Sequence, residues 1–312
     1  MKKRKKKNKI HYILGIQSYA NHDSGASILK FDDYGKILDY VAISEERIVR
    51  RKYTYAFPIN SINYCLEYFN LKDLKKIEYI FSDWIKTKNW LRSGPSYNYQ
   101  EFDYLKEKLN FNKKNVVQID HHLAHAATAY YASNYNEAAI LIVDGLGSDN
   151  ETNTYFVGKK HKIKLIEQYK HRGIGAVYAA VTSNILNLGF GGEGKTMGLA
   201  PYGKKSSKII KYKFNGIKTN FSDFLTRHPH SDVLNQINEN FRCEKIKVKN
   251  KKNVKKNFLN KYFSNIAYEV QDVAEKTFIH LGRDLYKKTK LKNICLAGGV
   301  ALNSVANGVL NE

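Results

Sequence analysis

The sequence predicts an α/β fold built from two similar units. In each half, three strand-like segments joined by short turns are followed by a helical segment and a further strand. The first set is IHYILGIQS, GASILKF and ILDYVAISEE, and the second is AAILIVDG, TNTYFVG and KIKLIEQYK. Strands that follow one another through short turns form an antiparallel meander. A meander followed by helix and strand, occurring twice, predicts a duplicated ribonuclease H-like unit, although no repeat is visible in the residues themselves.

The first half contains the elements of one such unit. Its predicted elements are, in order, strands at 10–18, 25–31 and 37–46, a helix at 57–70, a strand at 77–83, a helix around 100–109, a strand at 115–119 and a helix from about 122 to 133. The helix at 57–70 has apolar residues at helical spacing, and Pro58 stands near its start, where a missing N–H costs least.

The second half also begins with three strands and a helix, and a long insertion follows. Its predicted elements are strands at 138–145, 152–158 and 162–170, a helix at 173–189 that ends at Gly189, a helix from about 258 to 289, a strand at 292–299 and a helix at 300–310. AAILIVDG is almost wholly apolar and predicts a strand buried on both faces. The glycine-rich stretch GFGGEGKTMGLAPYG predicts a long loop of the kind that usually binds a ligand.

The charge of the chain is strongly positive but unevenly placed. The 52 Lys and Arg against 29 Asp and Glu give a formal net charge of +23, which favours an anionic partner. Much of the excess lies in KKRKKKNK and KIKVKNKKNVKK, which lack the interleaved aromatic residues that base stacking needs. We therefore expect a basic tail at 1–9, a first half at 10–135 and an incomplete second half at 136–312 with a solvated insertion at about 245–256. We do not expect a nucleic-acid partner.

Cysteine usage and hydropathy bear on the compartment. Cys65, Cys243 and Cys295 are far apart and odd in number, which indicates a reducing compartment and argues against a disulfide framework. No apolar run approaches the roughly 18 residues of a membrane span, and the segment after the basic N-terminus is too short for a signal peptide. A cytoplasmic protein without a membrane partner is the resulting expectation.

Three histidines in DHHLAHAATAYY are candidates for a metal site. His121 and His125 are four residues apart, so on a helix they face the same way and their imidazoles can converge on one ion. His122 points elsewhere on such a helix. By itself the spacing is also compatible with ordinary histidines on an alanine-rich helix.

Asp144 ends the buried strand AILIVD, at the edge of a sheet where binding sites gather, and is either a third ligand or a cap of the following turn. Two histidines and one carboxylate leave coordination positions open. That set suits iron or zinc acting on a substrate better than a closed structural zinc.

Two glycine pairs follow buried strands. Gly145 and Gly147 in DGLGSD either approach phosphate oxygens through their N–H groups or form a hairpin turn. Gly298 and Gly299 in LAGGVALN stand between a strand and a helix, where the backbone can approach a nucleotide closely. LAGGVALN lacks the spacing of the dinucleotide fingerprint and the pattern of the P-loop.

Four further polar residues stand in predicted loops. His22, Asp23 and Ser24 lie in NHDSGAS between two strands, where a general base or a phosphate contact could be placed. A serine nucleophile is not indicated, because the members of a catalytic triad meet in space from different elements. Lys195 in GGEGKTMG either holds a phosphate or is an ordinary solvated lysine.

Six blocks taken together resemble the carbamoyltransferases of the nodulation, cephamycin and tobramycin type. They are GIQSYANHDSGASIL, ISEERIVRRKYTYAFP, DHHLAHAATAYYAS, LIVDGLGSDNET, EGKTMGLAPYG and CLAGGVALNSVANG, in the family's order and at about its spacings. The resemblance runs from about residue 12 to the last residue. It implies an actin-like ATPase fold of the hsp70 and sugar-kinase type, related to the enzyme that makes threonylcarbamoyl-adenosine in tRNA.

The resemblance also implies an activity. Members transfer a carbamoyl group from carbamoyl phosphate, through a carbamoyl-adenylate made with ATP, to a hydroxyl of a small molecule. Carried over by motif, the metal ligands for Fe²⁺ or another divalent ion fall on His121, His125 and Asp144. His22 falls near the transferred carbamoyl group, and the general base is either His22 or an aspartate. The family's nucleotide-binding residues are matched by Gly145, Gly147, Lys195, Gly298 and Gly299.

The chain departs from the family in length, since members are close to twice as long and add a further metal aspartate and an adenylate-forming domain. We therefore expect a second ribonuclease H-like unit that is incomplete. Either a companion chain supplies the rest, or the chain is an inactive nucleotide-binding remnant. A tRNA-modifying enzyme is a further alternative, supported mainly by the charge, but its members are not expected to carry the ISEERIVRRKYTYAFP and EGKTMGLAPYG blocks in this form.

Overall fold

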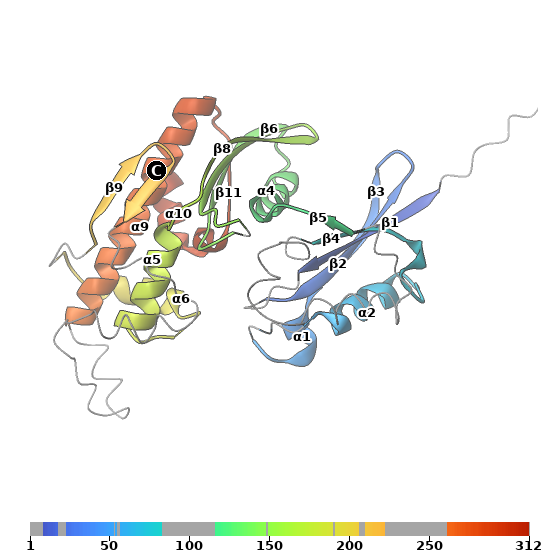
Figure 1. Ribbon diagram of the computed structural model, residues 1–312, viewed down its shortest axis with the longest axis horizontal. Coiled ribbons are helices and arrows are strands. Elements are labelled where there is room, and N and C mark those ends of the chain that lie inside the picture. The colour runs from blue at the N-terminus through green and yellow to red at the C-terminus, as the bar shows by residue number, and fades with distance from the viewer. Residues whose placement is uncertain are drawn as a thin grey trace, which may run out of the picture. The chain divides into compact units, whose positions relative to one another are not determined.

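The computed structural model describes residues 9–17, 23–52, 54, 57–82, 116–147, 149–189, 191–205, 210–221 and 261–311 (Figure 1). These residues divide into two compact units, Met1–His121 and His122–Glu312. Each unit contains one main sheet with helices, so the predicted α/β class is confirmed.

The first unit is built on a five-stranded sheet with the order β3-β2-β1-β4-β5. The strands are β1 (Ile10–Gln17), β2 (Gly25–Asp32), β3 (Ile37–Ser44), β4 (Ile77–Ser82) and β5 (Val116–Gln118), and the helices are α1 (Glu45–Val49) and α2 (Ile59–Tyr68). The strands β1, β2 and β3 are antiparallel neighbours, whereas β4 and β5 join parallel to β1 and to each other. The predicted meander is thus present, and α2 begins directly after Pro58.

One face of this sheet packs against α2. Leu14 of β1 and Ile28 of β2 are fully buried and share a core with Ile62 and Cys65 of the helix. Glu45, at the start of α1, is also buried, because its carboxylate accepts hydrogen bonds from the N–H and the hydroxyl of Ser61 at 2.8 and 2.6 Å. A buried carboxylate therefore caps the first turn of α2.

The second unit has a four-stranded sheet with the order β11-β6-β7-β8. Its elements are α4 (His121–Ala132), β6 (Glu137–Val143), β7 (Asn153–Lys159), β8 (Lys162–Tyr169), α5 (Ile174–Ala180), α6 (Glu193–Leu199), the hairpin β9 (Tyr212–Asn215) and β10 (Lys218–Phe221), α9 (Lys261–Thr289), β11 (Ile294–Ala297) and α10 (Ser304–Asn311). β6, β7 and β8 form the second meander, and β11 lies parallel to β6 as β4 does to β1. The described residues hold no strand in the position that β5 has in the first sheet.

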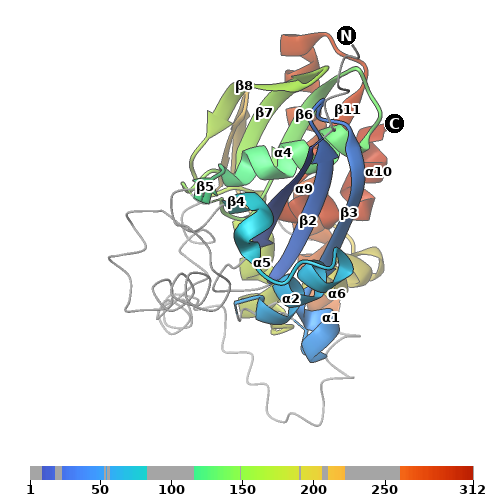
Figure 2. The ribbon, with the colours of Figure 1, turned by 90° about the vertical axis from the view of Figure 1, so that its right-hand side faces the viewer.

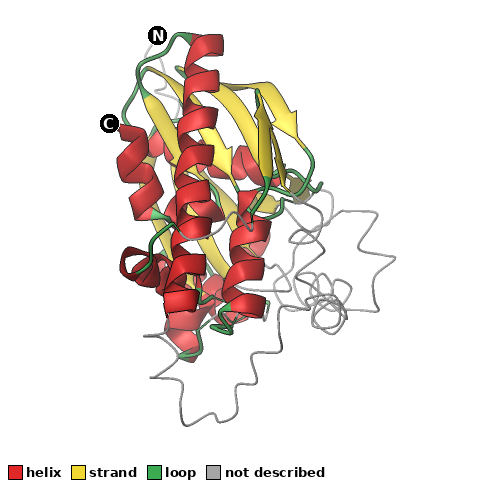
Figure 3. Ribbon diagram, turned by 90° about the vertical axis from the view of Figure 1, so that its left-hand side faces the viewer, coloured by secondary structure: helices red, strands yellow, loops and turns green. Residues whose placement is uncertain are grey.

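Both faces of β6 are covered by helices. Leu141 and Val143 point into a core formed with α5 and the long helix α9, which Figure 3 shows across one face of the sheet. Ile140 and Ile142 point into a second core with Ala126 and Tyr130 of α4, which lies across the sheet in Figure 2. AILIV is therefore apolar throughout because both sides of the strand are buried.

The helix at 122–133 belongs by sequence order to the predicted first half, whereas its apolar residues pack on the second sheet. The boundary that the sequence predicts between the two halves, at residues 135 and 136, stays a prediction. The helix expected around 100–109, residues 1–8 of the basic tail and the insertion at 245–256 lie outside the described residues.

Three predicted segments differ from the structure. The single helix at 173–189 is α5 followed by a π-helical turn at Val181–Ile185, in which the N–H of Leu186 bonds to the carbonyl of Val181 at 2.9 Å. The predicted loop at 189–203 contains α6 and a short 3₁₀ helix, Ala200–Tyr202. The helix expected at 300–310 is a 3₁₀ turn, Gly299–Leu302, and then α10.

Packing and capping explain the last two differences. Leu199 and Ala200 pack on Ala267 of α9, and this contact outweighs the poor helix propensity of the glycines in the 189–203 stretch. Asn303 caps α10, because its side-chain oxygen accepts from the N–H of Ala306 at 3.0 Å, and a cap residue cannot continue the helix before it. Within the described residues, no helix combines the length and the apolar character needed to cross a membrane.

Candidate functional site

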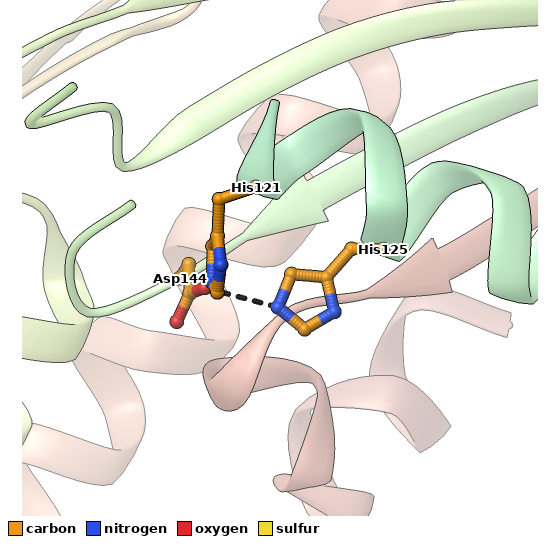
Figure 4. A group of neighbouring side chains, drawn as sticks. All are labelled: His121, His125 and Asp144. Carbon is orange, nitrogen blue, oxygen red and sulfur yellow. Dashed lines mark ion pairs between the residues drawn. The ribbon is translucent and has the colours of Figure 1, made fainter. Parts of the chain in front are cut away.

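The structure brings His121, His125 and Asp144 together. The two histidines lie one turn apart at the start of α4, and Asp144 directly follows β6. One ligand atom of each residue lies within 4.8 Å of those of the other two. Figure 4 shows the side chains converging, with Nε2 of His125 3.2 Å from Oδ2 of Asp144. The three residues that the resemblance names as ligands therefore form one cluster.

Two backbone N–H groups orient the carboxylate of Asp144. Its Oδ1 accepts from the N–H of Gly145 at 2.6 Å and from the N–H of Gly299 at 3.1 Å. The other oxygen, Oδ2, is the one that faces His125. Since Asp144 is only 8% exposed, these bonds also offset the cost of burying the charge. One oxygen of Asp144 thus faces the cluster, and the other accepts from the N–H groups of Gly145 and Gly299.

His122 lies behind the cluster. Its ring is fully buried, with Nδ1 2.7 Å from the hydroxyl of Thr154 and Nε2 4.0 Å from Oδ2 of Asp144. His122 is outside the three-residue cluster, but the expectation that it points elsewhere is wrong, because α4 packs face-on to β6 and β7. Helical spacing alone does not reveal a neighbour on another element.

Gly298 and Gly299 form a tight turn at the end of β11, which we call the glycine turn. Gly298 has a φ of 98°, and a Cβ there would lie 2.4 Å from the carbonyl oxygen of Val143. A Cβ on Gly299 would lie 3.0 Å from Oδ1 of Asp144. Gly298 is therefore required by the close approach of β11 to the end of β6, and Gly299 leaves little room for a side chain beside Asp144.

A third glycine, which sequence reasoning missed, lies close by. A Cβ on Gly175, in the first turn of α5, would lie 2.7 Å from the Cα of Gly145. A glycine inside an otherwise helical pattern was the signal that could have found this contact.

Gly145 and Gly147 lie in the connection between the antiparallel strands β6 and β7. The N–H of Gly147 bonds to the carbonyl of Glu151 at 2.8 Å, and a Cβ on Gly147 would overlap the side chain of Glu151. The hairpin interpretation thus has a structural basis. A nucleotide-binding role for the two glycines stays a prediction.

Lys195 and His22 are the remaining residues that the sequence predicts for the site. Lys195 is exposed on α6, so its expected position on a loop is wrong. His22 lies outside the described residues. Lys195 is not part of the cluster of His121, His125 and Asp144, and the roles of Lys195 and His22 stay predictions.

The cluster fits a divalent metal by its chemistry. Neutral imidazole and carboxylate are the ligands of zinc and of non-haem iron, and two histidines with one carboxylate leave positions for a substrate oxygen. His125 is one-third exposed, so one side of the cluster is accessible. The residues present therefore suit a reactive metal site better than a closed structural one.

The two sheet orders and the comparison with solved structures define the class of fold. The crystal structure of full-length HypF in its phosphate- and nucleotide-bound form matches with a TM-score of 0.50 at 13% identity, over 98% of this chain and 51% of that one. At this identity the match shows the fold alone. The fold is that of the actin-like ATPases, built on duplicated ribonuclease H-like units.

Sequence comparison then shows the family. A model of the carbamoyltransferase N-terminus matches residues 96–312, and the chain belongs to this family. An uncharacterized protein of Synechocystis, sll1178, is 31% identical over 96% of this chain and 52% of its own length. Nodulation protein NolNO of Sinorhizobium fredii is 27% identical over 97% of this chain and 44% of its own. The chain thus spans about half the length of these relatives.

Proposed function

We propose that this chain carries the transfer site of an O-carbamoyltransferase, which moves a carbamoyl group from carbamoyl-adenylate to a hydroxyl of a small molecule. Membership of the carbamoyltransferase family supports the reaction class. The observation that carries the proposal is the position of Asp144, whose carboxylate joins the histidine pair to the glycine turn. A metal site and a nucleotide-binding turn that share one residue suit a reaction between an adenylate and a metal-held group.

His121, His125 and Asp144 would hold Fe²⁺ or another divalent ion. When bound there, such an ion would supply a Lewis acid for the carbamoyl oxygen or the acceptor hydroxyl. The protein contributes the fixed direction of the ligands, because the N–H groups of Gly145 and Gly299 hold one oxygen of Asp144 and leave the other to the cluster.

The glycine residues would hold the adenylate. In this proposal the backbone at Gly145, Gly147, Gly298 and Gly299, which carries no side chain, lets the phosphate of carbamoyl-adenylate approach closely, with Lys195 as a further contact. Orienting both reactants lowers the entropic part of the barrier.

The transfer step needs a base. The acceptor oxygen forms a bond to the carbamoyl carbon, its proton passes to the base, and the bond between that carbon and the phosphate oxygen breaks, which releases AMP. His22 or an aspartate would be this base.

We further propose that formation of the adenylate from carbamoyl phosphate and ATP requires residues outside this chain. The curated relatives are about twice as long as the region they share with it. A companion chain would be one source of the remaining half.

Metal content tests the site directly. The chain is purified, loaded with Fe²⁺ or Zn²⁺ and measured by elemental analysis, and His121→Ala and His125→Ala are compared with His161→Ala, a histidine outside the cluster. We expect the first two variants to lose the bound metal and the third to retain it. Equal metal in all four proteins would refute the metal assignment.

Activity is tested in a second experiment. The chain is mixed with the C-terminal half of a full-length relative, carbamoyl phosphate, ATP and a panel of hydroxylated acceptors, and products are analysed by mass spectrometry. Added carbamoyl mass on an acceptor, dependent on both polypeptides and absent with Asp144→Asn, is the expected result. Carbamoylation that is equally fast with Asp144→Asn would contradict the proposed site.

A further inference from the structure

The outer strand of the first sheet, β3, differs from the other edge strands of the described residues. Natural sheet edges are commonly protected from pairing with further chains by shortness, lysine or proline. Here β5 and β11 have only three and four residues, β8 carries Lys162 and Lys164, and the four-residue strands β9 and β10 each hold a lysine. By contrast, β3 has eight residues and contains no lysine, arginine or proline. It is therefore the described edge most open to another strand.

Apolar side chains of β3 are exposed. Ile37, Leu38 and Tyr40 are 57%, 45% and 71% exposed, whereas Val41 and Ile43 are partly buried against the core shared with α2. Contiguous exposed apolar side chains mark interaction sites, and here they stand beside backbone groups that can pair with a further strand. The strand thus combines the two components of a strand-addition site.

The backbone of β3 directs alternate hydrogen-bonding groups away from β2. The N–H of Glu45, directly after the strand, donates to the carbonyl of Ser24 at 2.9 Å. Bonding alternates along an antiparallel pair, so every second residue of β3 bonds outward, among them Tyr40 and Ala42. The N–H of Tyr40 donates to the side chain of its neighbour Asp39 at 2.8 Å, in a solvent-exposed bond that a carbonyl of another strand can replace.

The side chains of β3 fit a second copy of the strand in one antiparallel register. A two-fold axis at Val41 places Tyr40 of each copy opposite Ala42 of the other, so a large side chain meets a small one. Asp39 then lies opposite an apolar residue of the second copy. An axis at Ala42 would instead place Asp39 opposite Glu45, and an axis at Tyr40 would extend the pairing into the bulge beyond Asp39.

The charge of this edge favours a second copy over a charged partner. The chain has a formal net charge of +23, but residues 37–44 contain a single charged residue, Asp39. An anionic partner would meet no basic side chain on the strand itself. Two copies of a strongly basic chain repel each other least where basic residues are absent.

We propose that β3 is a self-association edge, at which two copies of this chain pair antiparallel about Val41 and join their five-stranded sheets into one. Pairing of this kind is isologous and closed, so it leaves no free β3 edge. It would form roughly six to eight backbone hydrogen bonds, close to the number in a typical interface. The inference does not rest on the proposed function, because β3 contributes no residue to the cluster of His121, His125 and Asp144.

Sedimentation equilibrium of the full chain tests the edge. The parent is compared with Tyr40→Lys and with Leu165→Lys, which changes an exposed residue of β8, an edge that already carries lysine. We expect the parent and Leu165→Lys to have twice the mass of one chain. In Tyr40→Lys the dissociation constant should rise roughly tenfold or more, because a symmetric interface carries the change twice. Circular dichroism checks that both variants are folded. A monomeric parent, or an equally tight dimer in Tyr40→Lys, would overturn the proposal.

Cysteine cross-linking tests the register. In the proposed pairing the two Val41 residues are directly opposite, with Cα atoms about 4.5 Å apart, within reach of a disulfide. The two Ile43 residues are offset by four positions, roughly 13 Å along the strands. Mild oxidation should therefore produce a disulfide-linked dimer of Val41→Cys and none of Ile43→Cys or the parent. Cross-linking that is equal in the two variants, or absent from Val41→Cys, would exclude pairing about Val41.

Discussion

The backbone N–H of Gly299 donates to Oδ1 of Asp144 at 3.1 Å, across 155 residues of sequence. This bond ties the end of β11 to the end of β6 and orients the carboxylate that faces His125. Residues that look independent in the sequence, a glycine pair and a histidine pair, are therefore joined through one aspartate.

Replacing Gly298 with alanine should destabilise the second unit. A Cβ there would meet the carbonyl oxygen of Val143 at 2.4 Å, and the φ of 98° is unfavourable for any L side chain. We expect a loss of about 1–3 kcal/mol, the usual range for backbone strain of this kind. Chemical denaturation measures it, with Gly308→Ala in α10 as the control, because a Cβ at Gly308 meets nothing within 4 Å. The control should gain about 0.5–1 kcal/mol from helix propensity. Equal stability of both variants would mean that the turn is not strained.

Replacing Asp144 with asparagine should remove metal binding and leave the fold intact. The amide oxygen can still accept from the N–H groups of Gly145 and Gly299, but the charge is lost and an NH₂ group faces His125. We expect metal affinity to fall more than about 100-fold, while the unfolding temperature of the metal-free protein changes little. Asp149→Asn, in the same hairpin connection, is the matched control. Metal retention by Asp144→Asn would show that the aspartate is not a ligand.

The ring of His11 should titrate above the ordinary pKa of histidine. Its hydrogen bonds to Asp33 at 2.9 Å and to Glu78 at 2.5 Å raise the pKa of the ring. The pKa of Asp33 is lowered, first by the hydrogen bond from the backbone N–H of Lys9 and then by the one from His11. Because the folded-state pKa of His11 is raised, its stabilising effect is fully present below about pH 6.5 and is lost as pH rises through the folded value. Because the folded-state pKa of Asp33 is lowered, the stabilising effect of Asp33 is present above about pH 4 and is lost in more acidic solution.

The window between these limits is where His11→Gln should differ most from the parent. At pH 5 the unfolding temperature of His11→Gln should lie furthest below that of the parent, and this deficit should shrink above the folded-state pKa of His11. NMR titration of the ring gives that pKa directly. A deficit that grows with pH would contradict the arrangement.

Replacing Glu45 with alanine should weaken the first unit. The carboxylate is 1% exposed and accepts from Ser61 and Asn60 at the start of α2. Losing these bonds leaves the first turn of α2 without its partner, and a cost of about 2 kcal/mol is expected. Urea denaturation compares this variant with Glu67→Ala, an exposed position on the same helix that should change stability by less than about 0.5 kcal/mol. A similar loss in both variants would mean that the buried cap contributes nothing specific.

Local patterns predicted much of the fold and the three-residue cluster. The alternation and turns of the two meanders, and the four-residue spacing of His121 and His125, are properties of short segments that tertiary structure did not alter. The helical character of 193–199 was missed because packing on α9 overrides two glycines, and His122 was misjudged because its partner Thr154 is on another element. The buried hydrogen-bond network of Tyr178, Gln271 and Asn303 was not foreseen, since these polar residues are far apart in sequence and only the packed helices bring them together.

The burial of β6 on both faces also limits which insertions and deletions this segment tolerates. Successive residues of the strand face α9 and α4 in turn, so a single inserted or deleted residue within 137–143 would exchange the two sets of side chains between their cores. The same shift would turn the carboxylate of Asp144 away from His125. Length variation in this segment should therefore be selected against more strongly than almost any substitution in it.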